Sequence, residues 1–108
     1  MGLSAVLAGW ADRHGRELAL ELRGPLLPSG MDPTWLLSFT GGSSDGQIAL
    51  FRGPVVDVAA YRWARPHEGM CVGGAFGVAD DHFDRMLDDL LAMDCGGPVP
   101  NWLKLTPS

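Results

Sequence analysis

Three histidines and two cysteines are the side chains of this sequence best suited to nucleophilic or acid–base chemistry. His14 follows an N-terminal helical pattern, His67 lies in a loop-like segment, and His82 begins a second helical pattern. Nucleophilic catalysis needs a base beside the nucleophile on a rigid turn, and Cys71 with His67 or His82 is the one candidate pairing. A cysteine in an apolar stretch more often packs as a small hydrophobic residue. We therefore expect no catalytic residues, with a small enzyme or ligand-binding module of a biosynthetic cluster as an alternative.

The sequence also indicates neither a metal site nor a cofactor. Cys71 and Cys95 form no CxxC pair and no cluster with zinc spacing, and whether they form a disulfide stays open. The segment GGSSDG at 41–46 lacks the lysine of a P-loop and precedes a strand-like stretch, so it predicts a hairpin turn. Six aspartates crowd the second helical pattern, but a carboxylate metal site needs ligands that converge from several elements.

An acidic stripe runs along the helical pattern of residues 81–93, opposite its apolar residues. Arg85 is the only basic side chain on this helix. Such a stripe is either a solvated outer face or a surface that engages a basic partner. Trp63, at the end of a strand-like segment, either anchors a partner or closes the end of the core. The predicted partner-binding residues are Asp81, Asp84, Asp88 and Trp63.

Composition and charge limit the class of partner. The chain has 108 residues and a formal net charge of −5, which disfavours nucleic acid and anionic membranes and suits a basic protein. Hydrophobic residues make up 46% of the chain, enough for one core. The N-terminus has no basic start and its apolar stretch is broken by Gly9 and Asp12, so we expect no signal peptide and a cytoplasmic protein. Composition therefore predicts another protein, a basic one, as the partner, and a homodimer is an alternative.

Four stretches of alternating, β-branched or aromatic residues predict strands that short turns connect. They span residues 17–23, 34–40, 47–52 and 55–63. Short connections favour antiparallel neighbours, because parallel strands need long crossovers. Residues 69–78 fit either a fifth strand or a glycine-rich lid, and both remain open. The proline-containing loop at 24–33 is unusual in carrying the apolar residues Leu26, Leu27 and Met31.

Helices are predicted at residues 4–16 and 81–93, with Ser4 capping the first and Asp80 or Asp81 the second. The apolar stripe of the second helix should face the sheet, so Leu90→Ala is expected to cost about 2–5 kcal/mol. Asp88→Ala on the opposite face is expected to change stability by within about 0.5 kcal/mol. The stripe comprises Phe83, Met86, Leu87, Leu90 and Leu91.

The predicted fold is therefore a single α+β domain over residues 1–108. An antiparallel four- to five-stranded meander sheet is flanked by an N-terminal and a C-terminal helix. The tail at 96–108 contains Trp102, Leu103 and Leu105 and is expected to fold back on the body.

The order of these features resembles that of TriTu-type immunity proteins, small bacterial proteins encoded beside polymorphic toxins. The likeness rests on a short helix with Trp10, a charged and apolar strand at 17–23, WLLSF, QIALFRG, a strand with Asp57, and FDRMLDDLLAM. It covers residues 4–63 and 82–93, while residues 69–78 and 96–108 depart from the pattern. The resemblance implies neutralisation of a cognate toxin by occlusion.

The same order of elements is similar to that of secretion chaperones, which dimerise and wrap an unfolded effector segment. This second resemblance implies a homodimeric adaptor instead of an inhibitor. The frequent Ala, Gly, Leu, Asp and Arg residues are typical of a high-GC bacterial genome such as that of an actinobacterium.

Overall fold

The computed structural model describes residues 2–25, 34–51 and 55–106. Two α helices, a 3-10 turn and six strands lie within these ranges. In chain order they are α1 (Leu3–His14), β1 (Ala19–Arg23), β2 (Trp35–Thr40), β3 (Ser44–Phe51), β4 (Val55–Arg62), η1 (Pro66–Glu68), β5 (Met70–Ala75), α2 (Asp80–Asp94) and β6 (Lys104–Thr106). The loop at 24–33 that the sequence singled out, with Leu26, Leu27 and Met31, lies outside the described residues apart from Gly24 and Pro25.

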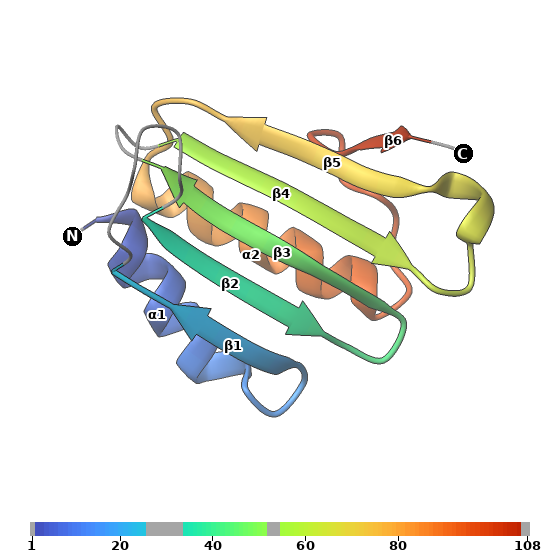
Figure 1. Ribbon diagram of the computed structural model, residues 1–108, viewed down its shortest axis with the longest axis horizontal. Helices are drawn as coiled ribbons and strands as arrows, with labels where there is room; N and C mark the ends of the chain where they lie inside the picture. Colours follow the sequence, from blue (N-terminus) through green and yellow to red (C-terminus); the bar gives the residue numbers. More distant parts are fainter. Residues whose placement is uncertain (1, 26–33, 52–54, 107–108) are drawn as a thin grey trace.

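The strands form one antiparallel sheet in the order β1-β2-β3-β4-β5-β6, each strand pairing with the next along the chain (Figure 1). The α+β class and the antiparallel meander are confirmed, but the sheet has six strands where four to five were predicted. Residues 69–78 contain a strand, β5, and the tail supplies the sixth, which pairs with the start of β5. Three residues with no strong alternation, as in β6, are too short a pattern to identify from sequence.

The two glycines of β5 explain why this segment also looked like a lid. A side chain at Gly73 would collide with the backbone of Trp102, and one at Gly74 would collide with the backbone of Val56. Glycine within a strand commonly marks such a close approach of another backbone segment. Gly73 therefore lets the tail pass beside β5, and the tail's return to the body is confirmed because Leu103 is buried.

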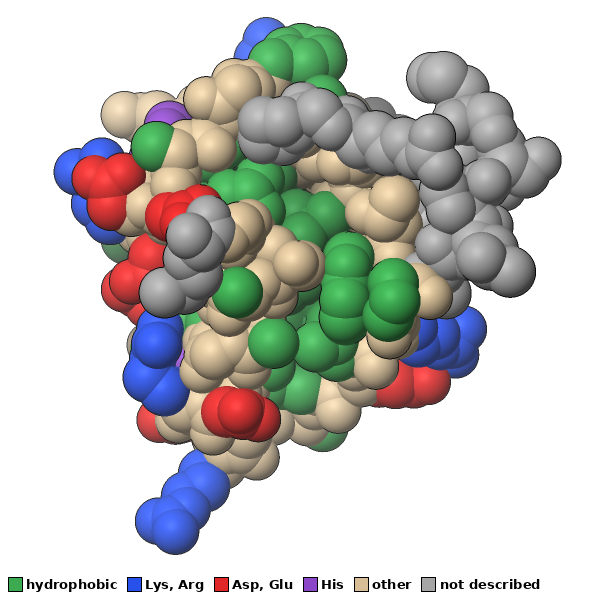
Figure 2. All heavy atoms as spheres, turned by 90° about the vertical axis from the view of Figure 1, so that its left-hand side faces the viewer, with side chains coloured by type: hydrophobic (Ala, Val, Ile, Leu, Met, Phe, Trp, Pro, Cys, Tyr) green, Lys and Arg blue, Asp and Glu red, His purple; other side chains and the backbone are tan. Residues whose placement is uncertain are grey.

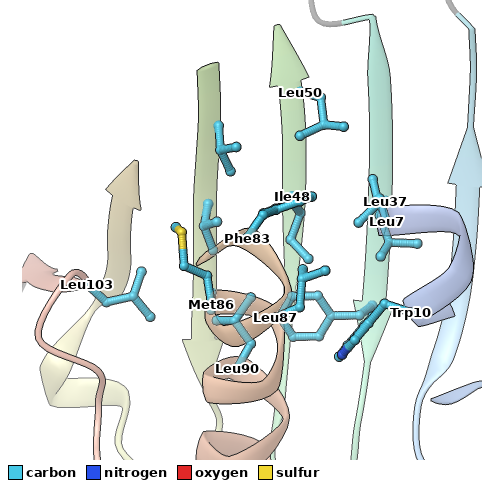
Figure 3. Close-up of a cluster of buried hydrophobic side chains, with 14 of the residues drawn as sticks. Leu7, Trp10, Leu37, Ile48, Leu50, Phe83, Met86, Leu87, Leu90 and Leu103 are labelled. Carbon is cyan, nitrogen blue, oxygen red and sulfur yellow. The ribbon is translucent and has the colours of Figure 1, made fainter. Parts of the chain in front are cut away.

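Both helices lie behind the sheet in Figure 1 and cover the same face. On α2, the predicted apolar stripe is confirmed, since Phe83, Met86, Leu87 and Leu90 are buried. Figure 3 shows these side chains directed toward residues of the sheet, among them Leu37 and Ile48. Helix α1 adds Leu7 and Trp10 to the same core, and the tail adds Leu103.

The predicted helix caps are wrong, although both helices exist. The cap position of α1 is Gly2, whose carbonyl accepts the N–H groups of Ala5 and Val6, so Ser4 lies inside the helix. The cap position of α2 is Ala79, and Asp80 and Asp81 occupy the first turn instead. Carboxylates in a first turn still suit the positive end of the helix dipole. Helix α2 ends at Asp94, one residue beyond its predicted end, and Gly96 follows with φ of +98°, a conformation that glycine adopts readily after a helix.

Candidate binding surface on the open sheet face

The candidate nucleophile of the sequence is inaccessible. Cys71 is completely buried on the helix-covered side of β5, and burial raises the pKa of its thiol, so the reactive thiolate is disfavoured. His67 in η1 and His82 in α2 are exposed, and neither is hydrogen-bonded to Cys71 within the described ranges. His14 packs against Trp10, with ring centroids 4.9 Å apart. Both cysteines are free, and the described residues hold no group of three or more potential metal ligands.

A buried ion pair fixes the turn between β4 and β5. The guanidinium of Arg62 donates from Nη2 and Nε to the two carboxylate oxygens of Glu68, at 2.6 and 3.0 Å. Both side chains are almost entirely buried. The bond from Arg62 lowers the pKa of Glu68 against the opposing effect of burial. This two-point contact holds η1 against the end of β4, so Arg62 and Glu68 serve the structure of this turn.

The segment GGSSDG forms the predicted β2–β3 hairpin, with β3 beginning at Ser44, and its turn also holds a carboxylate. Asp94, at the end of α2, accepts the backbone N–H groups of Gly42, Ser43 and Ser44 at 2.9–3.1 Å and the Ser44 hydroxyl at 2.8 Å. Burial alone would raise the pKa of Asp94, but these bonds lower it below its ordinary value. The backbone N–H groups of this turn therefore bind a carboxylate of the same chain, that of Asp94.

Two of the three stripe aspartates make contacts with α1. Asp84 pairs with Arg13 at 2.9 Å, and Asp88 accepts the indole N–H of Trp10 at 3.1 Å. The bond from the buried Trp10 argues for a larger cost of Asp88→Ala than the roughly 0.5 kcal/mol expected from an outer helix face. Arg13 approaches from a helix about seventy positions earlier in the chain, and no local charge count could have found it. Asp81 remains exposed at the start of α2.

The four predicted partner-binding residues do not share one surface. The acidic stripe lies opposite the buried stripe of α2 and so points away from the sheet. Trp63 continues the alternation of β4 beyond Tyr61, which puts it on the other side of the sheet. Its backbone N–H bonds to the carbonyl of Ser43, so the β3–β4 ladder extends to this residue.

No helix among the described residues covers the face of the sheet turned to the viewer in Figure 1, which we call the open face. Cross-strand partners share a face, so the register places Tyr61 beside Met70 and Ala59 beside Val72 on this side. Trp63, Met70 and Val72 are 43%, 40% and 37% exposed. They are three of the five most exposed large hydrophobic side chains described, and together they form an apolar ridge along β4 and β5.

Two carboxylates flank this ridge. Asp57 is exposed on β4, and Asp45 is half-buried on β3 opposite Tyr61. Among the described residues neither carboxylate is recorded in a hydrogen bond or an ion pair, in contrast to Glu68 and Asp94. This surface was not predicted, because residues 69–78 fit either a strand or a lid. The alternation of Met70 and Val72 with the buried Cys71 was the available signal.

Figure 2 shows the end of the molecule that lies at the left of Figure 1. Hydrophobic side chains gather near the middle of this view, and charged ones stand mainly around its margin. The view therefore shows no cluster of charged groups set among hydrophobic ones.

No protein-family model, no curated protein and no solved structure matches this chain. None of the described helices has the length and apolar character needed to span a membrane.

Proposed function

We propose that this protein is a cytoplasmic inhibitor that binds a basic partner protein, a cognate toxin, and neutralises it by occlusion. The observation that carries the proposal is the apolar ridge of Trp63, Met70 and Val72 on the open face, beside the carboxylates of Asp45 and Asp57. Large exposed apolar groups that adjoin one another mark interaction sites more often than isolated ones. The resemblance to TriTu-type immunity proteins supports the same function.

The size of the open face suits a specific protein contact. The strands contain 36 residues, and at about 3.3 Å along and about 4.8 Å across the sheet for each residue the face covers roughly 570 Å². A standard interface buries about 800 Å² on each partner. The net charge of −5 and the outward stripe at Asp81, Asp84 and Asp88 would speed the approach of a basic protein without forming the contact.

Co-expression with the protein encoded next to this chain's gene tests the proposal. We expect a one-to-one complex and protection of the host cell from that protein's toxicity. Trp63→Ala should weaken the complex by about tenfold or more, as truncation of a large aromatic contact residue does. Phe76→Ala is the matched control, because Phe76 is 86% exposed in the β5–α2 turn, and it should bind within about twofold of the native chain. Absence of both complex and protection would contradict the proposal.

A homodimeric adaptor of the secretion-chaperone type is the second candidate, favoured by the same exposed ridge. Two copies could bury their open faces against each other, as two sheets pack in a sandwich. Light scattering at micromolar concentration separates the candidates. A monomer supports the inhibitor, whereas a dimer that Met70→Asp dissociates supports the adaptor.

A further inference from the structure

We infer that the open face receives an amphipathic helix of the partner, lying along β3 and β4 with one basic side chain over Asp45 and another over Asp57. This inference rests on the proposed function, since it names the chemistry that the proposed contact surface recognises. The grounds are the shape of the face, the spacing of its carboxylates and the position of its apolar ridge.

The face is hollowed along its middle. One hollow, of about 480 Å³, includes Asp57, Ala59 and Val72 in its lining, and a second, of about 450 Å³, includes Asp45, Ala59 and Met70. The two hollows adjoin at Gln47 and Ala59, and each has a carboxylate in its lining. We treat them together as one shallow groove, in which Ala49 and Ala59 keep the surface low and the exposed Gln47 is a long polar side chain at the junction. Such a groove admits a helix, which binds through residues along one stripe.

The spacing of the carboxylates fits a helix. Asp57 stands opposite Ala49, which is four residues from Asp45 on β3, so the two carboxylates are roughly 14 Å apart along the groove. Residues eight positions apart on an α helix are separated by about 12 Å and lie on the same side. Lysine or arginine at two such positions would reach both carboxylates, because their stems are long and flexible.

The ridge determines what lies between the two basic positions. Met70 and Val72 border the groove on the β5 side and would pack against apolar residues of the helix. Methionine adapts its shape to a partner more readily than branched residues do. Lys104 stands opposite Val72 on β6, so the side of the helix turned toward β6 should not be basic. Charge complementarity therefore decides which side of the helix faces β6, as well as the composition of the helix.

A designed peptide tests the groove without knowledge of the toxin. The probe is an 18-residue helical peptide with a leucine stripe and lysines at its fifth and thirteenth positions, added to the full chain labelled at its methyl groups. We expect saturable NMR shifts at Met70, Val72 and Ala59. A matched peptide with glutamate in place of both lysines should leave these methyl groups unchanged. Shifts centred on α2, or none at the groove, would overturn the inference.

Charge-neutral variants give the second measurement. The double variant Asp45→Asn/Asp57→Asn should weaken binding of the lysine peptide by about tenfold, because charge pairs at contacts contribute to affinity. The control double variant Asp12→Asn/Glu17→Gln removes the same charge from two exposed positions, one in α1 and one just after it, and should change binding by less than about twofold. Thermal melts of all variants check that the fold is intact. Equal weakening by the two double variants would mean that net charge alone attracts the peptide, which would overturn the inference.

The neighbouring gene product separates this inference from the proposed function. If it binds the native chain but binds Asp45→Asn/Asp57→Asn equally well, the helix in the groove is wrong while the inhibitor proposal stands. If it does not bind the native chain but the lysine peptide occupies the groove, the groove is supported and the toxin assignment fails. A dimer that protects the Met70 and Val72 methyl groups from the peptide would overturn the inference in favour of a second copy.

Discussion

On the helix-covered face of the sheet, Ile48 is completely buried, whereas its neighbour Gln47 on the open face is exposed. The two buried carboxylates are both bonded: Glu68 to Arg62, and Asp94 to the β2–β3 turn. On the open face, Glu21 pairs with Arg23 at the exposed surface, whereas Asp45 and Asp57 have no such partner among the described residues. Burial with a bonded partner thus separates Glu68 and Asp94, which stabilise the fold, from Asp45 and Asp57, which are available to a partner.

The largest expected difference between the faces concerns their carboxylates. Glu68→Ala should lower the free energy of unfolding by about 3–5 kcal/mol, because it leaves the buried guanidinium of Arg62 without its partner. Asp57→Ala, on the open face, should change it by within about 0.5 kcal/mol. Urea melts of both variants measure the difference. Similar losses for the two would mean that the carboxylates of the open face also stabilise the fold.

Apolar burial should show the same asymmetry within one strand. Ile48→Ala should cost about 2–5 kcal/mol, because it opens a cavity beneath α2. The adjacent Gln47→Ala should cost within about 0.5 kcal/mol. Leu90→Ala, on the helix side of the same core, is expected to match Ile48→Ala. A large loss from Gln47→Ala in denaturant melts would show that the open face is covered in solution.

Lowering the pH should destabilise the fold by protonating the buried carboxylate of Asp94. The pKa of this carboxyl is lowered in the folded chain, so its contribution to stability is present above its ordinary value of 3.8 and is lost as pH falls below it. Asp94→Asn should therefore destabilise the fold at pH 7, by about 1–3 kcal/mol for the weakened bonds. The difference in stability between the native chain and this variant should shrink toward pH 2, as thermal melts would measure. A gap that stays constant with pH would show that the ionised form does not matter.

The smallest expected effect separates two aspartates of the acidic stripe. Asp88→Ala should cost about 1 kcal/mol, because the indole N–H of the buried Trp10 loses its acceptor. Asp81→Ala should cost within about 0.5 kcal/mol, since its side chain is exposed. Calorimetry resolves this difference, and equal values would mean that water replaces the carboxylate of Asp88 without loss.

Much of the fold followed from local patterns. The spacing of Phe83, Met86, Leu87 and Leu90 identified α2 and its buried side, since a period near 3.6 belongs to helices. Alternation identified β1 to β4 to within three residues at their ends. The predicted caps were wrong because helix ends are uncertain by one or two residues. Helix α1 begins earlier than predicted, so Ser4 lies inside it and cannot cap it.

The candidate site followed from the sequence only in part. Trp63 was predicted either to anchor a partner or to close the end of the core, and the structure places it on the open face, half-exposed. Its neighbours Met70 and Val72 were not predicted as contact residues, because Gly73 and Gly74 weaken the strand pattern of the segment that carries them. The stripe residues Asp84 and Asp88 were recognised as surface groups, but their bonds to Arg13 and Trp10 join helices more than seventy positions apart.

The sequence alone therefore determined the local elements, the single antiparallel order of the first four strands and the apolar face of α2, because hydrophobic periodicity is read within one element. Only the tertiary structure decided which face of the sheet both helices cover, that the tail closes the sheet as β6, and that Asp94 is bound by a turn fifty positions earlier. These outcomes depend on which distant segments come together in space. A buried charge is stable only where such a distant partner meets it, and spacing along the chain does not record that partner.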